Sequence, residues 1–149
     1  MPFFFHSEDV TCHLANESAT VDFLHHVVTS ENCQAGDINI VFCSDEHLHQ
    51  LNQSYLNHDT LTDIITFDYS NNSVLTGDLF ISIERAHENA DLYNVSVNEE
   101  LHRLFVHGIL HLAGYTDKTN EDNEKMRAKE DVCLKELSNH DVSRGTSPF

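Results

Sequence analysis

Two histidines, His107 and His111, stand four residues apart in the segment HGILHLAGYTD (107–117), and their spacing suggests metal chemistry. On a helix, side chains at positions i and i+4 are neighbours on one face, so both imidazoles can bind a single metal ion. Gly114 permits the chain to turn back after the helix, because glycine adopts positive φ at little cost, and Asp117 then returns to the same side. The pattern H-x-x-x-H-x-x-G-x-x-D therefore predicts a metal site with the ligands His107, His111 and Asp117.

A helix that carries histidines without binding a metal is the alternative interpretation. The chain has 12 histidines, so a pair at positions i and i+4 arises easily by chance. The glycine and the aspartate that follow favour the metal site, and carboxylate oxygen is an accepted zinc ligand. We therefore expect a Zn²⁺ ion, although Asp117 makes the site more anionic and more tolerant of harder divalent cations such as Mn²⁺.

The ligand spacing is similar to the metzincin metallopeptidase motif, H-E-x-x-H-x-x-G-x-x-H. Gly108 stands where such a peptidase carries the glutamate that serves as its general base. Asp117 stands in place of the third histidine. Because the base is missing, a metallopeptidase ranks behind the two functions considered below.

The elements that must position these residues can be predicted from hydrophobic periodicity and capping signals. Ser96 and Glu99 form a capping box, which predicts a helix at 97–112 that ends before Gly114. We expect strands at 3–6, 37–43, 64–69 and 78–83, and further helices at about 21–28, after Ser44, from about Glu84 and from about Thr119. Three or four strands in a mixed sheet with about five helices indicate an α+β fold. We expect a single compact domain over residues 1–142 and a frayed tail at 143–149.

The composition limits the classes of partner. Lys and Arg total 8 against 25 Asp and Glu, which gives a formal net charge of −17 at pH 7. General attraction to nucleic acid or to an anionic membrane is therefore disfavoured, and an anionic partner must be held locally. The four cysteines form no C-x-x-C pair, which favours free thiols in a reducing cytoplasm. The N-terminus lacks the basic region of a signal peptide, and no apolar run is long enough to span a bilayer, so we expect a cytoplasmic protein without a membrane partner.

The segment HGILHLAGY resembles the signature H-G-x-L-H-L-x-G-Y-D-H of the YbeY family of bacterial endoribonucleases. Seven specified positions agree: His107, Gly108, Leu110, His111, Leu112, Gly114 and Tyr115. Upstream, Leu51, Asn52, Tyr55, Asp59 and residues 62–67 (TDIITF) are similar to the family's L-N-x-x-Y-R-x-x-D-x-x-T-D-V-L-S-F block, and residues 77–82 (GDLFIS) to its G-D-I-x-I-S strand. These matches follow the family's order and cover most of residues 40–126.

The resemblance implies a compact zincin-like α+β domain and metal-dependent cleavage of single-stranded RNA. The implied substrate is precursor ribosomal RNA of the small subunit, and the implied roles are ribosomal RNA processing and ribosome quality control. His107 and His111 match two metal ligands of the family, and Asp117 falls where its third histidine stands. A shift of the alignment by one residue would place Lys118 at the ligand position, which the spacing from Gly114 and the chemistry of lysine both disfavour.

Leu56 replaces the arginine that follows the tyrosine in L-N-x-x-Y-R, so the expected phosphate-binding cation is missing. Arg103 lies one turn before His107 and is a candidate to compensate, because a guanidinium matches phosphate geometry. Pairing of Arg103 with Glu99 or Glu100 on the helix surface is the alternative. The candidates for the general base are Asp63 and His58, both in the loop before the IITF strand.

The charge of −17 also predicts weak, salt-sensitive affinity for free RNA. A ribosome or a ribosome-associated protein could deliver the substrate. For the same reason, a non-catalytic ribosome-assembly adaptor with a structural metal remains the alternative function. Turnover of single-stranded RNA by nuclease-free protein discriminates the two.

Overall fold

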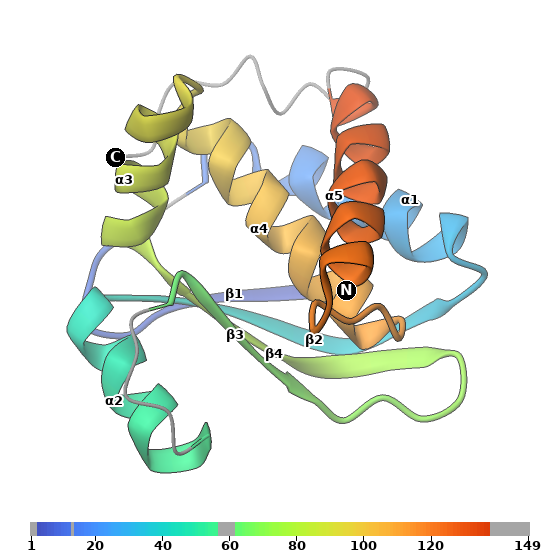
Figure 1. Cartoon of the computed structure of the whole chain (residues 1–149), viewed down its shortest axis with the longest axis horizontal. Helices are drawn as coiled ribbons and strands as arrows, with labels where there is room; N and C mark the ends of the chain where they lie inside the picture. The colour runs from blue at the N-terminus through green and yellow to red at the C-terminus, as the bar shows by residue number, and fades with distance from the viewer. Residues whose placement is uncertain (1–2, 13, 57–61, 138–149) are drawn as a thin grey trace.

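A four-stranded mixed sheet forms the framework of the computed structural model, which describes residues 3–12, 14–56 and 62–137 (Figure 1). The strand order is β1-β2-β4-β3. The strands are β1 (Phe3–Ser7), β2 (Gln34–Cys43), β3 (Ile64–Asp68) and β4 (Val74–Ser82). β2 runs parallel to both β1 and β4, whereas β3 runs antiparallel to β4. The predicted α+β class with a mixed sheet is confirmed.

Five helices accompany the sheet in the described part of the chain. They are α1 (Glu17–Ser30), α2 (Asp45–Leu56), α3 (Ile83–Tyr93), α4 (Val97–Leu112) and α5 (Asn120–Lys135). α1, α3, α4 and α5 lie on one side of the sheet, and α2 lies on the other (Figure 1). Within the described residues, no helix has both the length and the apolar character that crossing a membrane requires.

The side chains of β2 alternate between the two faces of the sheet, and apolar side chains are buried on both faces. Ile38, Ile40 and Phe42 point into the larger core, which they share with α1 and α4. Cys43 instead joins Leu48 of α2 in a smaller cluster on the opposite face. Side chains of a strand alternate between faces, so a strand that is apolar at successive positions must be buried between two layers.

β4 begins at Val74, four residues before the predicted start at Asp78. Residues 74–77 are not a strongly apolar run, but Val74 pairs with Gln34 at the start of β2. The extension of both strands therefore depends on their pairing with each other. A non-local partner of this kind is not encoded in the local periodicity that sets the predicted boundary.

α4 has the predicted bounds, and its capping groups are those expected from the sequence. The Ser96 hydroxyl accepts a hydrogen bond from the backbone N–H of Glu99 at 3.0 Å. At the other end, Gly114 has a φ of +105°, and the Tyr115 N–H donates to the Leu110 carbonyl at 3.0 Å. The positive φ turns the chain back beside the helix. The loop that follows can therefore return Asp117 to the face of α4 that carries the histidines.

His58 and the tail at 143–149 lie outside the described residues, as does the predicted domain limit at residue 142.

Candidate metal centre

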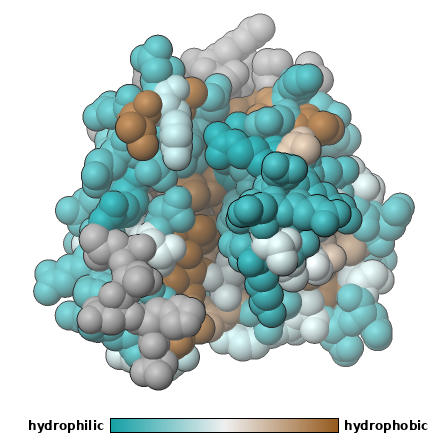
Figure 2. Space-filling model, in the orientation of Figure 1, coloured by the Kyte–Doolittle hydropathy of each residue, from teal (hydrophilic) through white to brown (hydrophobic). Residues whose placement is uncertain are grey.

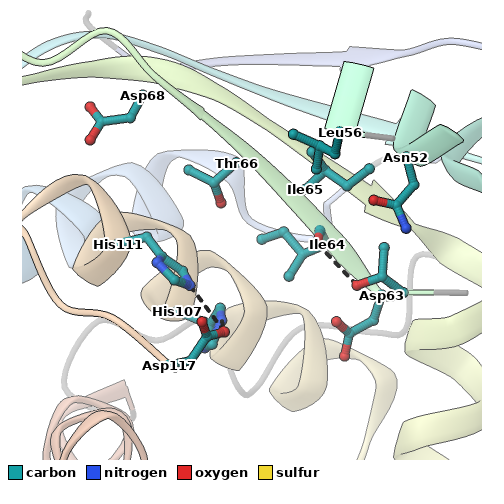
Figure 3. Close-up of a pocket in the computed structure, with 11 residues that line it drawn as sticks. Asn52, Leu56, Asp63, Ile64, Ile65, Thr66, Asp68, His107, His111 and Asp117 are labelled. Carbon is teal, nitrogen blue, oxygen red and sulfur yellow. Dashed lines mark hydrogen bonds and ion pairs between the residues drawn. The ribbon is translucent and has the colours of Figure 1, made fainter. Parts of the chain in front are cut away.

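His107, His111 and Asp117 come together where α4 ends and the chain turns back (Figure 3). Asp117 Oδ2 lies 3.4 Å from His111 Nε2 and 3.9 Å from His107 Nε2. The three candidate ligand atoms all lie within 4.8 Å of one another. Nitrogen and oxygen ligands of a tetrahedral zinc ion, each at about 2.0–2.2 Å from the metal, are roughly 3.3 Å apart. The donor types therefore suit a divalent metal ion, and the ligand atoms lie near this spacing but somewhat wider apart.

Glu130 of α5 is the residue of this centre that sequence reasoning missed. Its side chain is 7% exposed, and Oε2 lies 2.7 Å from His107 Nδ1. An ionised carboxylate can only accept, so the His107 Nδ1–H donates this bond and Nε2 is left free on the side of Asp117. One signal was present in the sequence: Glu130 is an acid four residues after Met126 and three before Cys133, which are both buried on the inner face of α5.

Arg103 lies beside the centre but is engaged in ion pairs. Its Nη1 donates to Glu130 Oε1 at 3.0 Å, and its Nη2 donates to Asp131 Oδ1 at 2.8 Å. Arg103 therefore forms ion pairs, as the alternative interpretation expected, but its partners lie on α5 and are not Glu99 or Glu100 of its own helix. The guanidinium therefore holds the carboxylate that in turn holds His107.

The two imidazoles have different proton affinities. Burial opposes protonation of His107, but the hydrogen bond and the negative charge of Glu130 outweigh it, so the pKa of His107 is raised. Burial, followed by the charge of neighbouring His107, lowers the pKa of His111. The two rings are close, with centroids 4.8 Å apart. A metal ion must displace the proton from each ring that it binds.

The centre opens into a cavity of about 580 Å³, which we call the metal cavity. Figure 3 shows Ile64 and Thr66 of β3 on the side of this space opposite the histidines, with Leu56 and Asn52 from α2 at one end. Asp63 and Asp68 also line the cavity. The space-filling view shows a hollow near the middle of this face, with hydrophobic residues in its floor and hydrophilic residues on its flanks (Figure 2). Among the described residues that line the cavity there is no lysine or arginine.

Asp63 belongs to a partly buried hydrogen-bond network beside the metal cavity. Asn89 Nδ2 donates to Asp63 Oδ2 at 3.1 Å and to Glu100 Oε2 at 3.3 Å. Glu100 is 3% exposed, and its burial raises the pKa of this carboxyl group. The amide therefore bridges the two carboxyl groups and orients Asp63, which shares the lining of the metal cavity with His107.

Gly108 faces the sheet and not the metal cavity. A Cβ atom at this position would lie 2.3 Å from Leu79 Cδ2 and 2.6 Å from Leu79 Cγ. The close approach of α4 to β4 leaves no room for a larger side chain. The glutamate that a metallopeptidase carries here could not be accommodated, which agrees with the inference against a peptidase.

An H-x-x-x-H helix packed on a mixed sheet, with a carboxylate from the loop after it, defines an α+β domain with a candidate metal site. Comparison with known proteins identifies the family. The family model described as Endoribonuclease YbeY matches residues 5–138, so the chain belongs to the YbeY family of endoribonucleases. This finding confirms the resemblance seen in the sequence.

Individual relatives agree with this assignment. The chain is 54% identical over 118 residues to "Endoribonuclease YbeY" of Flavobacterium johnsoniae, covering 79% of this chain and 85% of that protein. It is 47% identical over 127 residues to the protein of the same name from Flavobacterium psychrophilum, covering 85% and 91%. The solution structure of TM1509 from Thermotoga maritima matches with a TM-score of 0.67 at 24% identity and covers 98% of this chain and 97% of that one, which shows a common fold.

Proposed function

We propose that this protein cleaves single-stranded RNA with a zinc ion held by His107, His111 and Asp117, and that its substrate is precursor ribosomal RNA of the small subunit. The observation that carries this proposal is the convergence of the three ligand atoms within 4.8 Å beside an open cavity of about 580 Å³. A concave site of this kind admits a flexible strand more easily than a rigid duplex. Membership of an endoribonuclease family supports RNA as the substrate class.

Zinc is the proposed metal because two imidazoles and a carboxylate form a borderline donor set in a small site. Asp117 leaves Mn²⁺ as the alternative, since a carboxylate in place of an imidazole favours harder cations. When bound, the metal would supply Lewis-acid activation of a phosphoryl group and of the attacking water.

The residues of the chain have separable roles in this scheme. Glu130 and Arg103 keep the Nε2 atom of His107 directed at the metal position. Asp63 is the proposed general base, because it lines the same cavity as both histidines and is oriented by Asn89. His58 remains an alternative base. Arg103 retains three further N–H donors that could reach a phosphate, although two of its donors are already engaged by Glu130 and Asp131.

The charge of −17 and the absence of a described cation in the lining of the metal cavity both weaken binding to free RNA. We therefore propose that the substrate is presented by the ribosome or a ribosome-associated protein in the cytoplasm, during ribosomal RNA processing and quality control. The same observations favour a second candidate, a ribosome-assembly adaptor with a structural metal, because Leu56 lines the cavity where the family arginine is expected.

The test is cleavage of a labelled single-stranded RNA by untagged, nuclease-free protein, before and after chelation and after zinc is restored. We expect His107→Ala and His111→Ala to abolish both the bound zinc and the cleavage while the far-ultraviolet circular dichroism is retained. His87→Ala is the matched control, because His87 is not among the described residues that line the metal cavity. Cleavage that survives in metal-free His107→Ala would contradict the proposal, and a wild type that binds zinc without cleaving RNA would favour the adaptor.

A further inference from the structure

A second cavity of about 290 Å³ adjoins the metal cavity. The two cavities share Asp63 and His107 in their linings, so they meet at the metal centre. The floor of the second cavity is the face of α4 that carries Glu100, Arg103, Leu104 and His107. Its walls are α3 and α5, which stand on either side of α4 (Figure 1). A strand of RNA with its phosphate at the metal centre would therefore place an adjacent nucleotide at this opening.

Flat groups from both walls meet at this cavity. Tyr93, the last residue of α3, is 51% exposed although it is a large aromatic side chain. The guanidinium of Arg127 on α5 lies over the Tyr93 ring, 5.7 Å from its centroid. Arg127 forms no ion pair with any described residue, in contrast to Arg103 in the same lining. Aromatic rings and arginine planes are the surfaces on which nucleic-acid bases stack.

The remaining polar groups disfavour a phosphate and suit a base. Asp63, Glu100 and Glu130 place carboxylates in the lining, and Asn89 and Asn123 add side-chain amides. Carboxylates repel a phosphate but accept hydrogen bonds from the amino group of a base. Met126 contributes an apolar surface. This combination of flat, apolar and hydrogen-bonding groups is typical of a pocket for a neutral planar ligand.

We propose that the second cavity is a nucleobase subsite, which binds one base of single-stranded RNA next to the phosphate held at the metal centre. The inference rests on the proposed function and adds the contact that fixes the RNA. The base stacks against Tyr93 and Arg127, and a base with an exocyclic amino group is favoured over uracil because the lining is rich in acceptors. Stacking also offsets the unfavourable effect of the negative net charge on RNA binding, since it provides affinity that does not require neutralised phosphates.

The test measures binding of fluorescent 2′-O-methyl oligoadenylate and oligouridylate to the zinc-loaded protein by anisotropy at low salt, with cleavage of the unmodified RNA assayed in parallel. We expect Tyr93→Ala to weaken binding of oligoadenylate about tenfold, the loss typical of one stacked base. Tyr93→Phe keeps the ring and should bind like the wild type. Arg127→Ala should also weaken binding, and the wild type should prefer oligoadenylate.

Tyr69→Ala is the matched control, because Tyr69 is an exposed tyrosine that lines neither cavity. Equal binding by Tyr93→Ala, Tyr69→Ala and wild type, with cleavage intact in the wild type, would overturn the subsite and leave the proposed function standing. Equal affinity of the wild type for both oligonucleotides would overturn the preference for an amino group. A wild type that neither binds nor cleaves RNA would overturn both proposals.

Discussion

Glu130 Oε2 and His107 Nδ1, from residues 23 positions apart in the sequence, lie 2.7 Å from each other and are joined by a hydrogen bond. This contact decides which nitrogen of His107 is available to a metal. It also links α5 to the centre, because Arg103 holds the other oxygen of the same carboxylate at 3.0 Å. A carboxylate that fixes a histidine tautomer in this way is a recurrent feature of metal sites.

Glu130→Gln should lower the zinc affinity by about 10- to 100-fold, the range typical of a lost outer-shell partner. The amide can donate to Nδ1, which stabilises the tautomer whose Nε2 carries the hydrogen and cannot bind a metal. Competition with a chromophoric zinc chelator measures the affinity. Glu124→Gln is the control, because Glu124 is exposed on the same helix. Equal zinc affinity in both variants would refute the role of Glu130.

Replacing Asp117 tests both the third ligand and the alignment of the loop. Asp117→Ala should lower the zinc affinity more than Glu130→Gln does, because it removes a direct ligand. Asp117→His should retain zinc and shift the preference further from Mn²⁺ toward Zn²⁺, since imidazole is the softer donor. Lys118→Ala should leave metal binding unchanged. Elemental analysis by mass spectrometry measures the metal content of the three variants. Loss of metal in Lys118→Ala alone would favour the shifted alignment.

Leu56→Arg should strengthen binding of single-stranded RNA. Leu56 lines the metal cavity and is 41% exposed, so an arginine there can extend into the cavity without being buried. One added phosphate contact should steepen the dependence of log K on log salt by about 0.7. Leu92→Arg adds the same charge on α3 at an exposed position that lines neither the metal cavity nor its neighbour. A salt dependence that is equally steep in both variants would indicate an effect of net charge only.

His102 should make the protein less stable as the pH falls. Burial lowers its pKa from 6.5 to about 4. Both nitrogens of the neutral ring form hydrogen bonds: Nδ1–H donates to the Asn98 carbonyl at 2.6 Å, and Nε2 accepts from the Thr20 hydroxyl at 2.8 Å. The unfolded chain therefore binds the proton more readily, so the free energy of unfolding decreases as the pH falls below 6.5 and levels off near 4.

Between pH 7 and pH 5, this single group should remove about 2 kcal/mol of stability. Urea denaturation of metal-free wild type and of His102→Gln at the two pH values measures the effect. The variant should be less stable at neutral pH but should lack this part of the pH dependence. An identical change in both proteins would show that His102 is not its source.

The sequence by itself determined the helix of the metal centre and its candidate ligands, because these depend on local rules. The Ser96–Glu99 capping box predicted where α4 begins, and Gly114 predicted where it ends. Helical geometry alone places His107 and His111 on one face. The return of Asp117 follows from one residue with positive φ.

Only the tertiary structure decided the partners that surround those ligands. The contact of Glu130 with His107, and the pairing of Arg103 with α5 and not with its own helix, depend on how α5 packs against α4. The second cavity likewise exists only because α3 and α5 flank the same face of α4. Local propensity and hydrophobic period specify which face of a helix is buried, but they do not specify the neighbouring element or its axial position. Those are set by packing between segments that are distant in the chain.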